Sequence, residues 1–182
     1  MSDMSMAIRS FVRRGVGAAR LDPWTYEEVE ADRGANGQAA LMVALSAVAA
    51  GLGSIQNHGL GGVLWYTAAA LAGWYVWAAI AWLIGTRWLP TPETRADHGE
   101  LLRTIGFSSA PGVLRVLGLF APIAGVVFLV STVWMLVAMV VAVRQALDYC
   151  TTARAIAVCA LGFPVYALTL ALSLLLLGPW PI

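Results

Sequence analysis

Charge is scarce in this chain, and lysine is missing altogether. Charged residues make up 12% of the 182 positions, whereas soluble domains carry about 25%. Hydrophobic residues make up 60%, and the mean hydropathy is +0.77. This composition excludes an ordinary soluble domain, and the net charge of +1 gives no sign of a nucleic-acid partner.

Cysteine is also scarce, which bears on disulfides and metals. Cys150 and Cys159 would lie on roughly opposite faces of one helix, so a mutual disulfide is unfavourable. Neither belongs to a CxxC or Cys/His pattern. Asp97, His98 and Glu100 lack a second set of ligands and are better explained as helix capping. We therefore expect no metal and no cofactor.

Catalytic motifs are missing as well. The sequence contains no HExxH, Walker A or GxGxxG pattern. Ser108 and Ser109 do not have the GxSxG spacing, and no histidine follows them. No aspartate or glutamate lies inside an apolar run, although many proton-coupled carriers need one there. The sequence predicts a protein that is not an enzyme.

The hydrophobic residues fall in runs of about twenty, the length that crosses the ~30 Å hydrocarbon core of a bilayer. We expect an all-α fold, a polytopic transmembrane helical bundle with about five spans and no cleavable signal peptide. Glycines predict a turn at 54–62. The expected spans cover residues 38–55, 63–88, 101–120, 123–143 and 155–177.

The third of these spans is broken by proline. Ala110, Pro111 and Gly112 interrupt the apolar pattern, and we expect serine hydroxyls and neighbouring helices to satisfy the freed backbone groups. The alternative is a re-entrant segment at 101–120, which leaves four crossings.

The N-terminal segment, residues 1–36, precedes the expected transmembrane domain at 37–182. Residues 4–21 predict an Arg-rich amphipathic helix on the membrane surface. The alternative is a frayed tail, because Gly15 and Gly17 weaken the helix. Asp22 and Pro23 then predict the start of a short helix with a solvated acidic face, ending near residue 34.

The arginines predict the orientation. With five spans, every arginine except Arg115 falls on one side, and the connections at 54–62 and 121–122 contain none. The positive-inside rule then places the N-terminus in the cytoplasm and the C-terminus outside. Four crossings would leave Arg144 and Arg154 outside, which the rule disfavours.

Arg115 is the exception, since it lies near the outer end of the third span. Its side chain either reaches the interface or contacts a lipid phosphate or substrate inside the bundle. Arg144 and Asp148 stand four residues apart and are expected to pair at the end of the fourth span.

Residues 94–107 and 110–112, with the later stretches 134–136 and 142–149, resemble the bacterial Yip1-domain membrane proteins. The acidic lead-in at 25–30 also fits that family. The resemblance implies a five-span protein of the bacterial inner membrane with no defined enzymatic activity. Eukaryotic relatives associate with Rab-type GTPases, which suggests a membrane-protein or small-GTPase-like partner.

We therefore expect a non-enzymatic membrane protein of Yip1 type that organises membrane proteins or lipids within the bilayer. Small residues on the spans permit a homo-oligomer. The alternative is a small transporter or lipid-permeating protein, which the broken third span with Arg115 suggests, because discontinuous helices often line substrate sites. The candidate partner- or lipid-binding residues are Arg95, Asp97, Glu100, Arg103, Arg115, Arg144 and Asp148.

Overall fold

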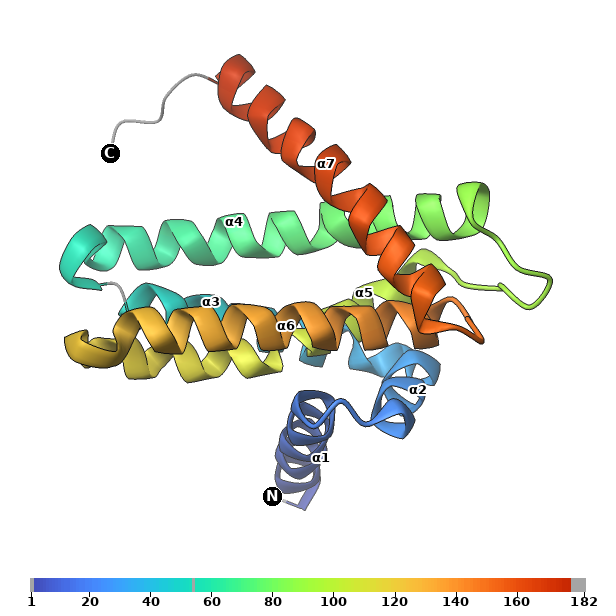
Figure 1. Ribbon diagram of the computed structural model, residues 1–182. Coiled ribbons are helices and arrows are strands. Elements are labelled where there is room, and N and C mark those ends of the chain that lie inside the picture. Colours follow the sequence, from blue (N-terminus) through green and yellow to red (C-terminus); the bar gives the residue numbers. More distant parts are fainter. Residues whose placement is uncertain (1, 54, 178–182) are drawn as a thin grey trace.

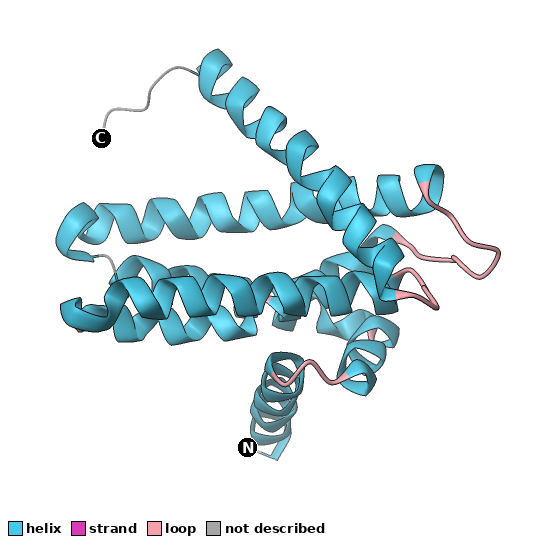
Figure 2. Ribbon diagram, in the orientation of Figure 1, coloured by secondary structure: helices cyan, strands magenta, loops and turns pink. Residues whose placement is uncertain are grey.

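The computed structural model describes residues 2–53 and 55–177, and among these residues it contains helices and loops but no strand (Figure 2). The α-helices are α1 Ser2–Ala19, α2 Pro23–Ala31, α3 Asn36–Gly53, α4 Ile55–Leu83, α5 His98–Ser108, α6 Ala124–Ala146 and α7 Thr152–Leu177. Four shorter helical turns join them: η1 Arg33–Ala35, η2 Ile84–Trp88, η3 Ala110–Leu119 and η4 Ala121–Ile123.

Three helical stretches in the described part of the chain are long and apolar enough to cross a membrane. They are Arg33–Gly53, Val63–Trp88 and Ala121–Ala146, and a shorter apolar helix follows at Thr152–Leu168. The all-helical fold with apolar helices of membrane-spanning length is thus confirmed. The expected third span is not one helix, because α5 ends at Ser108 and the 3₁₀ helix η3 follows.

The long helices form a bundle with two unlike ends (Figure 1). We call the end where α4 and α6 finish and α5 and α7 begin the polar end. At the opposite end, the apolar end, α3 meets α4 and η4 leads into α6. α5 and η3 follow one another along the bundle from the polar to the apolar end. Between residues 36 and 177, every charged residue except Arg115 belongs to the polar-end segments 84–103 and 144–154.

The predicted turn at 54–62 is wrong for residues 55–62. The helix α4 already begins at Ile55, and only position 54 of the predicted turn lies outside the described residues. Glycine weakens a helix by up to ~1 kcal/mol, but a backbone in an apolar surrounding must bond to itself. A helix meets that need, so the glycines do not open a loop here.

Local chemistry explains both ends of α5. The Asp97 carboxylate accepts a hydrogen bond from the Glu100 amide at 2.8 Å, and the Glu100 carboxylate accepts one from the Asp97 amide at 2.7 Å. At the other end, the Ser108 and Ser109 hydroxyls donate to the carbonyls of Ile105 and Gly106. These hydroxyls bond to carbonyls in the last turn of α5, directly before the break.

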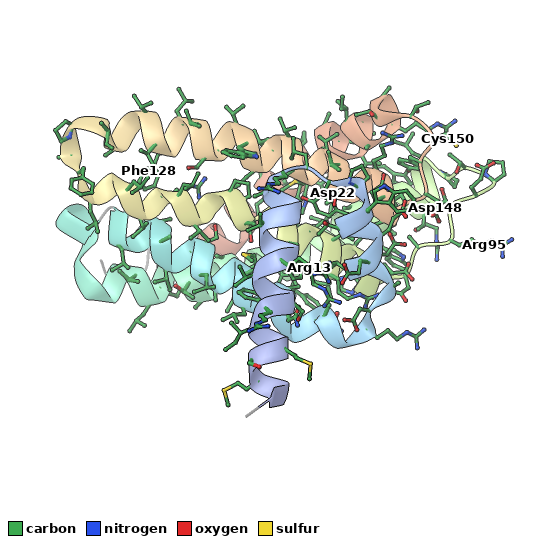
Figure 3. All side chains as sticks on the ribbon, turned by 90° about the horizontal axis from the view of Figure 1, so that it is seen from below. Arg13, Asp22, Arg95, Phe128, Asp148 and Cys150 are labelled. Atoms are coloured by element: carbon green, nitrogen blue, oxygen red, sulfur yellow. The ribbon has the colours of Figure 1, made fainter. Side chains whose placement is uncertain are left out.

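The α1 helix lies across the bundle axis, as Figures 1 and 3 show from two directions. Leu21 ends the connection from α1 with a φ of 62°, and Asp22 caps α2 by accepting from the Trp24 amide at 3.3 Å. An exposed apolar row, formed by Met4, Ile8, Val12 and Val16, runs along α1. The N-terminal segment thus forms a helix with an exposed apolar row.

The N-terminal segment shares a core with the bundle. Tyr26 and Val29 of α2 are fully buried, in one cluster with Phe107 of α5. Close approach of α3 and α5 needs Gly106, because a Cβ there would lie 2.7 Å from the Cβ of Ala39. The packing of α2 on α5 therefore fixes the N-terminal segment against the polar end.

Candidate functional site

An acidic cleft opens at the polar end, between α2, the 89–97 loop and the connection from α6 to α7. Its volume is about 680 Å³. Five carboxylates line it, from Glu27, Glu30, Glu93, Glu100 and Asp148, and one guanidinium, from Arg144. Figure 3 shows Asp148 and Cys150 at this end of the molecule.

Among the described residues, no ion pair involves a carboxylate that lines the acidic cleft. Burial is the main cause that raises the pKa of Glu30 to about 7, and the nearby negative charges of Glu100, Asp148 and Glu27 contribute to the rise. Arg103 acts in the opposite direction but contributes least. The contribution of these neighbouring carboxylates indicates a negative potential in the cleft, so the cleft is suited to a cationic group.

Arg144, the cation that lines the acidic cleft, is held by its own chain. Its guanidinium lies 3.2 Å from the Tyr149 carbonyl and 3.5 Å from that of Cys150. The predicted pairing with Asp148 is wrong, because no ion pair joins these two residues in the described chain. The helix ends at Ala146, and Asp148 has a φ of 52°, so the helical spacing of four does not apply.

The remaining polar-end candidates differ in what they can offer a partner. Arg103 is 3% exposed and donates to the Glu30 carbonyl from both Nε and Nη2, at 3.0 and 2.5 Å. Asp97 and Glu100 form the capping box of α5. Arg95 is exposed and projects from the loop before α5 (Figure 3). The structure therefore places Arg103 inside the fold and brings Glu100, Arg144 and Asp148 to the cleft.

A second space, the bundle cavity, lies between the helices and has a volume of about 290 Å³. Side chains from α3, α4, α5, η3, α6 and α7 line it, and most of its wall is apolar. Arg115 of η3 supplies the charged group on that wall.

Arg115 points toward α6. Its Nη2 donates to the Thr132 hydroxyl at 2.8 Å, and its Cζ lies 5.7 Å from the centre of the Phe128 ring. Its Nε is buried and has no acceptor among the described residues. Trp77 also lines the cavity and is 7% exposed. Its Nε1 is likewise buried without an acceptor among the described residues.

Sequence reasoning missed Trp77 and the acidic residues Glu27, Glu30 and Glu93. Glu27 and Glu30 of α2 were expected on a solvated face, but the cleft gathers them with Glu93. The distribution of the arginines predicts that α2 and the 89–97 loop lie on the same side of the membrane. This prediction could have indicated that the glutamates of α2 and Glu93 lie close together. No pattern of spacing indicates Trp77, whose neighbours come from distant segments.

The sequence matches no family model, and the searches of curated proteins and of solved structures found no match either. Within the described residues, no cluster of histidine, cysteine or carboxylate side chains is arranged to hold a metal ion.

Proposed function

We propose that the chain is a non-enzymatic membrane protein of the bacterial inner membrane that organises other membrane proteins or lipids. The observation that carries the proposal is the acidic cleft, whose carboxylates form no ion pair among the described residues and lie beside a membrane-spanning bundle. A basic segment of a partner protein is the ligand that such a cleft favours. The resemblance to the Yip1 family, including its small-GTPase-like partners, supports the same proposal.

The position of α1 supports a role at the membrane surface. The helix lies across the bundle axis, so it runs parallel to a membrane that the bundle crosses. Its exposed apolar row and the exposed arginines Arg9 and Arg20 suit the headgroup region of an anionic leaflet. The acidic cleft then opens to the cytoplasm close to that surface.

The test is quantitative affinity purification from native membranes in mild detergent, followed by mass spectrometry. A double charge reversal, Glu93→Lys with Asp148→Lys, changes two exposed cleft residues and spares the capping box. We expect it to lose the proteins that co-purify with the wild type while membrane insertion is kept. The matched control is Arg95→Glu, which reverses an exposed charge outside the cleft lining. Unchanged co-purification by the cleft variant would contradict the docking proposal.

We also propose that the chain crosses the membrane five times, with its N-terminus in the cytoplasm and its C-terminus outside. The path of α5 and η3 from the polar to the apolar end supports a third crossing over the re-entrant alternative. The position of nearly all arginines at one end supports the orientation. A fluorescent reporter fused after Ile182 should be dark, because it would be exported; a fluorescent fusion would rule out five crossings.

A second function, transport or lipid permeation, is favoured by the bundle cavity and its charged wall residue Arg115. Discontinuous helices such as α5 and η3 line substrate sites in many transporters. Solute flux into proteoliposomes that is abolished by Arg115→Ala would support this function. Liposomes that stay impermeable to ions, amino acids and lipid probes would oppose it.

A further inference from the structure

The bundle cavity opens sideways, toward the surface that lipid would cover. Leu136 of α6 and Phe163 of α7 both line it, although they are 51% and 62% exposed. Figure 1 shows that α7 leaves α6 near the polar end and passes obliquely across α4. The opening between α6 and α7 is therefore bordered by apolar side chains, and a hydrocarbon chain can enter it from the bilayer.

The size and wall of the cavity suit one flexible chain. Its 290 Å³ lies at the small end of the range of about 300–1,000 Å³ for ligand pockets. Two methionines, Met135 and Met139, face it from α6. Methionine side chains adapt their shape to an irregular apolar partner, which favours an acyl chain over a rigid planar ligand.

N–H groups of two residues, Arg115 and Trp77, interrupt this apolar wall. The guanidinium of Arg115 donates a hydrogen bond to Thr132. Both Arg115 Nε and Trp77 Nε1 are buried without an acceptor in the described chain. Buried N–H groups are nearly always satisfied, so an acceptor from outside the chain is expected here.

The charge of Arg115 is also uncompensated. The ion pairs of the described residues involve Arg13 and Arg14, and none of them includes Arg115. A cation at membrane depth usually faces a partner of opposite charge, and a guanidinium binds a carboxylate or phosphate most strongly. The missing acceptor is thus expected to be an acidic oxygen.

We propose that the bundle cavity binds one acyl chain whose acidic head group accepts hydrogen bonds from Arg115. The head group is a carboxylate or a phosphate, and the apolar wall of the cavity holds the chain. This site goes beyond the docking function of the acidic cleft. It is also independent of solute flux, because a retained lipid need not cross the membrane.

The two cysteines allow a direct test on the full chain in neutral detergent. Cys159 lines the cavity, whereas Cys150 is exposed at the polar end. In a Cys150→Ser protein, the rate of Cys159 alkylation by N-ethylmaleimide reports whether the cavity is filled. We expect oleate to slow alkylation severalfold, and we expect no slowing by methyl oleate, which lacks the charge, or by acetate, which lacks the chain. Equal slowing by methyl oleate, slowing by acetate, or no slowing by oleate would overturn the proposal.

Variants separate the head-group contact from the cavity itself. Arg115→Gln should abolish protection by oleate, and Arg115→Lys should keep most of it. Arg154→Gln is the matched control, since this exposed arginine donates to the Pro90 carbonyl at the polar end. Ala70→Phe fills the cavity from α4 and should remove the effect of oleate with Arg115 intact, which keeps the test valid if Arg115→Gln does not fold. Protection that survives both changes would overturn the site.

Two further ligands identify the source of the bound acyl chain. Slowing by phosphatidylglycerol but not by diacylglycerol, which lacks the phosphate, supports a membrane phospholipid, and slowing by oleate alone supports a free fatty acid. Equal slowing by diacylglycerol would contradict the acidic head group. The Glu93→Lys/Asp148→Lys protein should keep the protection, so failure of the cleft proposal and failure of the lipid site are distinguishable.

Discussion

Arg13 of α1 and Glu28 of α2 form a two-pronged ion pair that ties the amphipathic helix to the bundle. Arg13 Nη1 lies 2.7 Å from Glu28 Oε2, and Nη2 lies 2.6 Å from Oε1. Arg14 joins the same carboxylate at 3.0 Å through its Nε and reaches Asp32 at 2.8 Å. One face of α1 thus bonds to protein, and the exposed apolar row of α1 is left for the membrane.

The first prediction concerns the pH dependence of this clamp. The hydrogen bond from Arg13 is the main cause that lowers the pKa of Glu28 to about 2. A lowered carboxyl pKa means that the clamp is fully present above the ordinary value of 4.5 and is lost as the pH falls toward 2. Hydrogen exchange of the α1 amides should therefore be constant from pH 7 to 5, after correction for the intrinsic rate, and rise below pH 4.

The variant Glu28→Gln should give faster α1 exchange already at neutral pH, because the charged acceptor is gone. Glu27→Gln on the same helix is its control, as Glu27 bonds to Gln145 at 2.8 Å and not to α1. Equal rates of α1 hydrogen exchange in the wild type, Glu28→Gln and Glu27→Gln would contradict a clamp centred on Glu28.

Arg103 is predicted to matter for stability and not for partner binding. Its removal as Arg103→Ala leaves the Glu30 carbonyl without its two donors, which should cost about 2–3 kcal/mol. Arg95→Ala, at an exposed position, should change stability by less than about 0.5 kcal/mol. Thermal unfolding in neutral detergent distinguishes the two, and similar melting temperatures for both variants would argue against the internal role of Arg103.

Gly106 is predicted to be required for the contact of α3 with α5. The added methyl of Gly106→Ala would meet Ala39 on both its Cβ and its backbone, and such overpacking costs about 1–3 kcal/mol. Gly37→Ala places the same methyl in open space near the start of α3 and should be neutral or slightly stabilising. Chemical unfolding in detergent compares the pair; a stable Gly106→Ala protein would refute the close packing.

Glu30 is predicted to destabilise the protein at alkaline pH. Because its pKa is raised from 4.5 to about 7, the folded state binds a proton that the unfolded state has lost, and stability falls as the pH rises from 4.5 to 7. Glu30→Gln should thus be more stable than the wild type at pH 8, by about 1 kcal/mol after allowance for solvent screening. The two proteins should unfold alike at pH 4.5, and a wild type that gains stability between pH 4.5 and 7 relative to Glu30→Gln would contradict the raised pKa of Glu30.

Features set by local chemistry were predictable from the sequence. Asp97 and Glu100 form the expected capping box because both partners lie within one turn. Pro111 ends the α-helix where expected because it cannot donate a backbone hydrogen bond. The apolar runs predicted the long helices because bilayer thickness fixes their length.

Features set by distant contacts were not predictable in this way. Arg103 was expected on a contact surface, yet its acceptor is a backbone carbonyl 73 residues away on α2. The spacing of Arg144 and Asp148 suggested a pair, but the chain leaves the helix between them. The bundle cavity has no sequence pattern at all, because six separate elements supply its wall.

Site-directed labelling in bacterial spheroplasts tests the central claim, a bundle that spans the membrane with its polar end in the cytoplasm. Cys150 is exposed at the polar end, and Ala121→Cys places an exposed thiol at the apolar end. Each thiol is studied as the single cysteine of its protein. Cys150 is kept in a Cys159→Ser protein, and the Ala121→Cys variant also carries Cys150→Ser and Cys159→Ser. The reagent is a membrane-impermeant maleimide. We predict that the thiol at 121 reacts in intact spheroplasts and that Cys150 reacts only after lysis. Reaction of Cys150 in intact spheroplasts, or the same behaviour at both positions, would contradict the account.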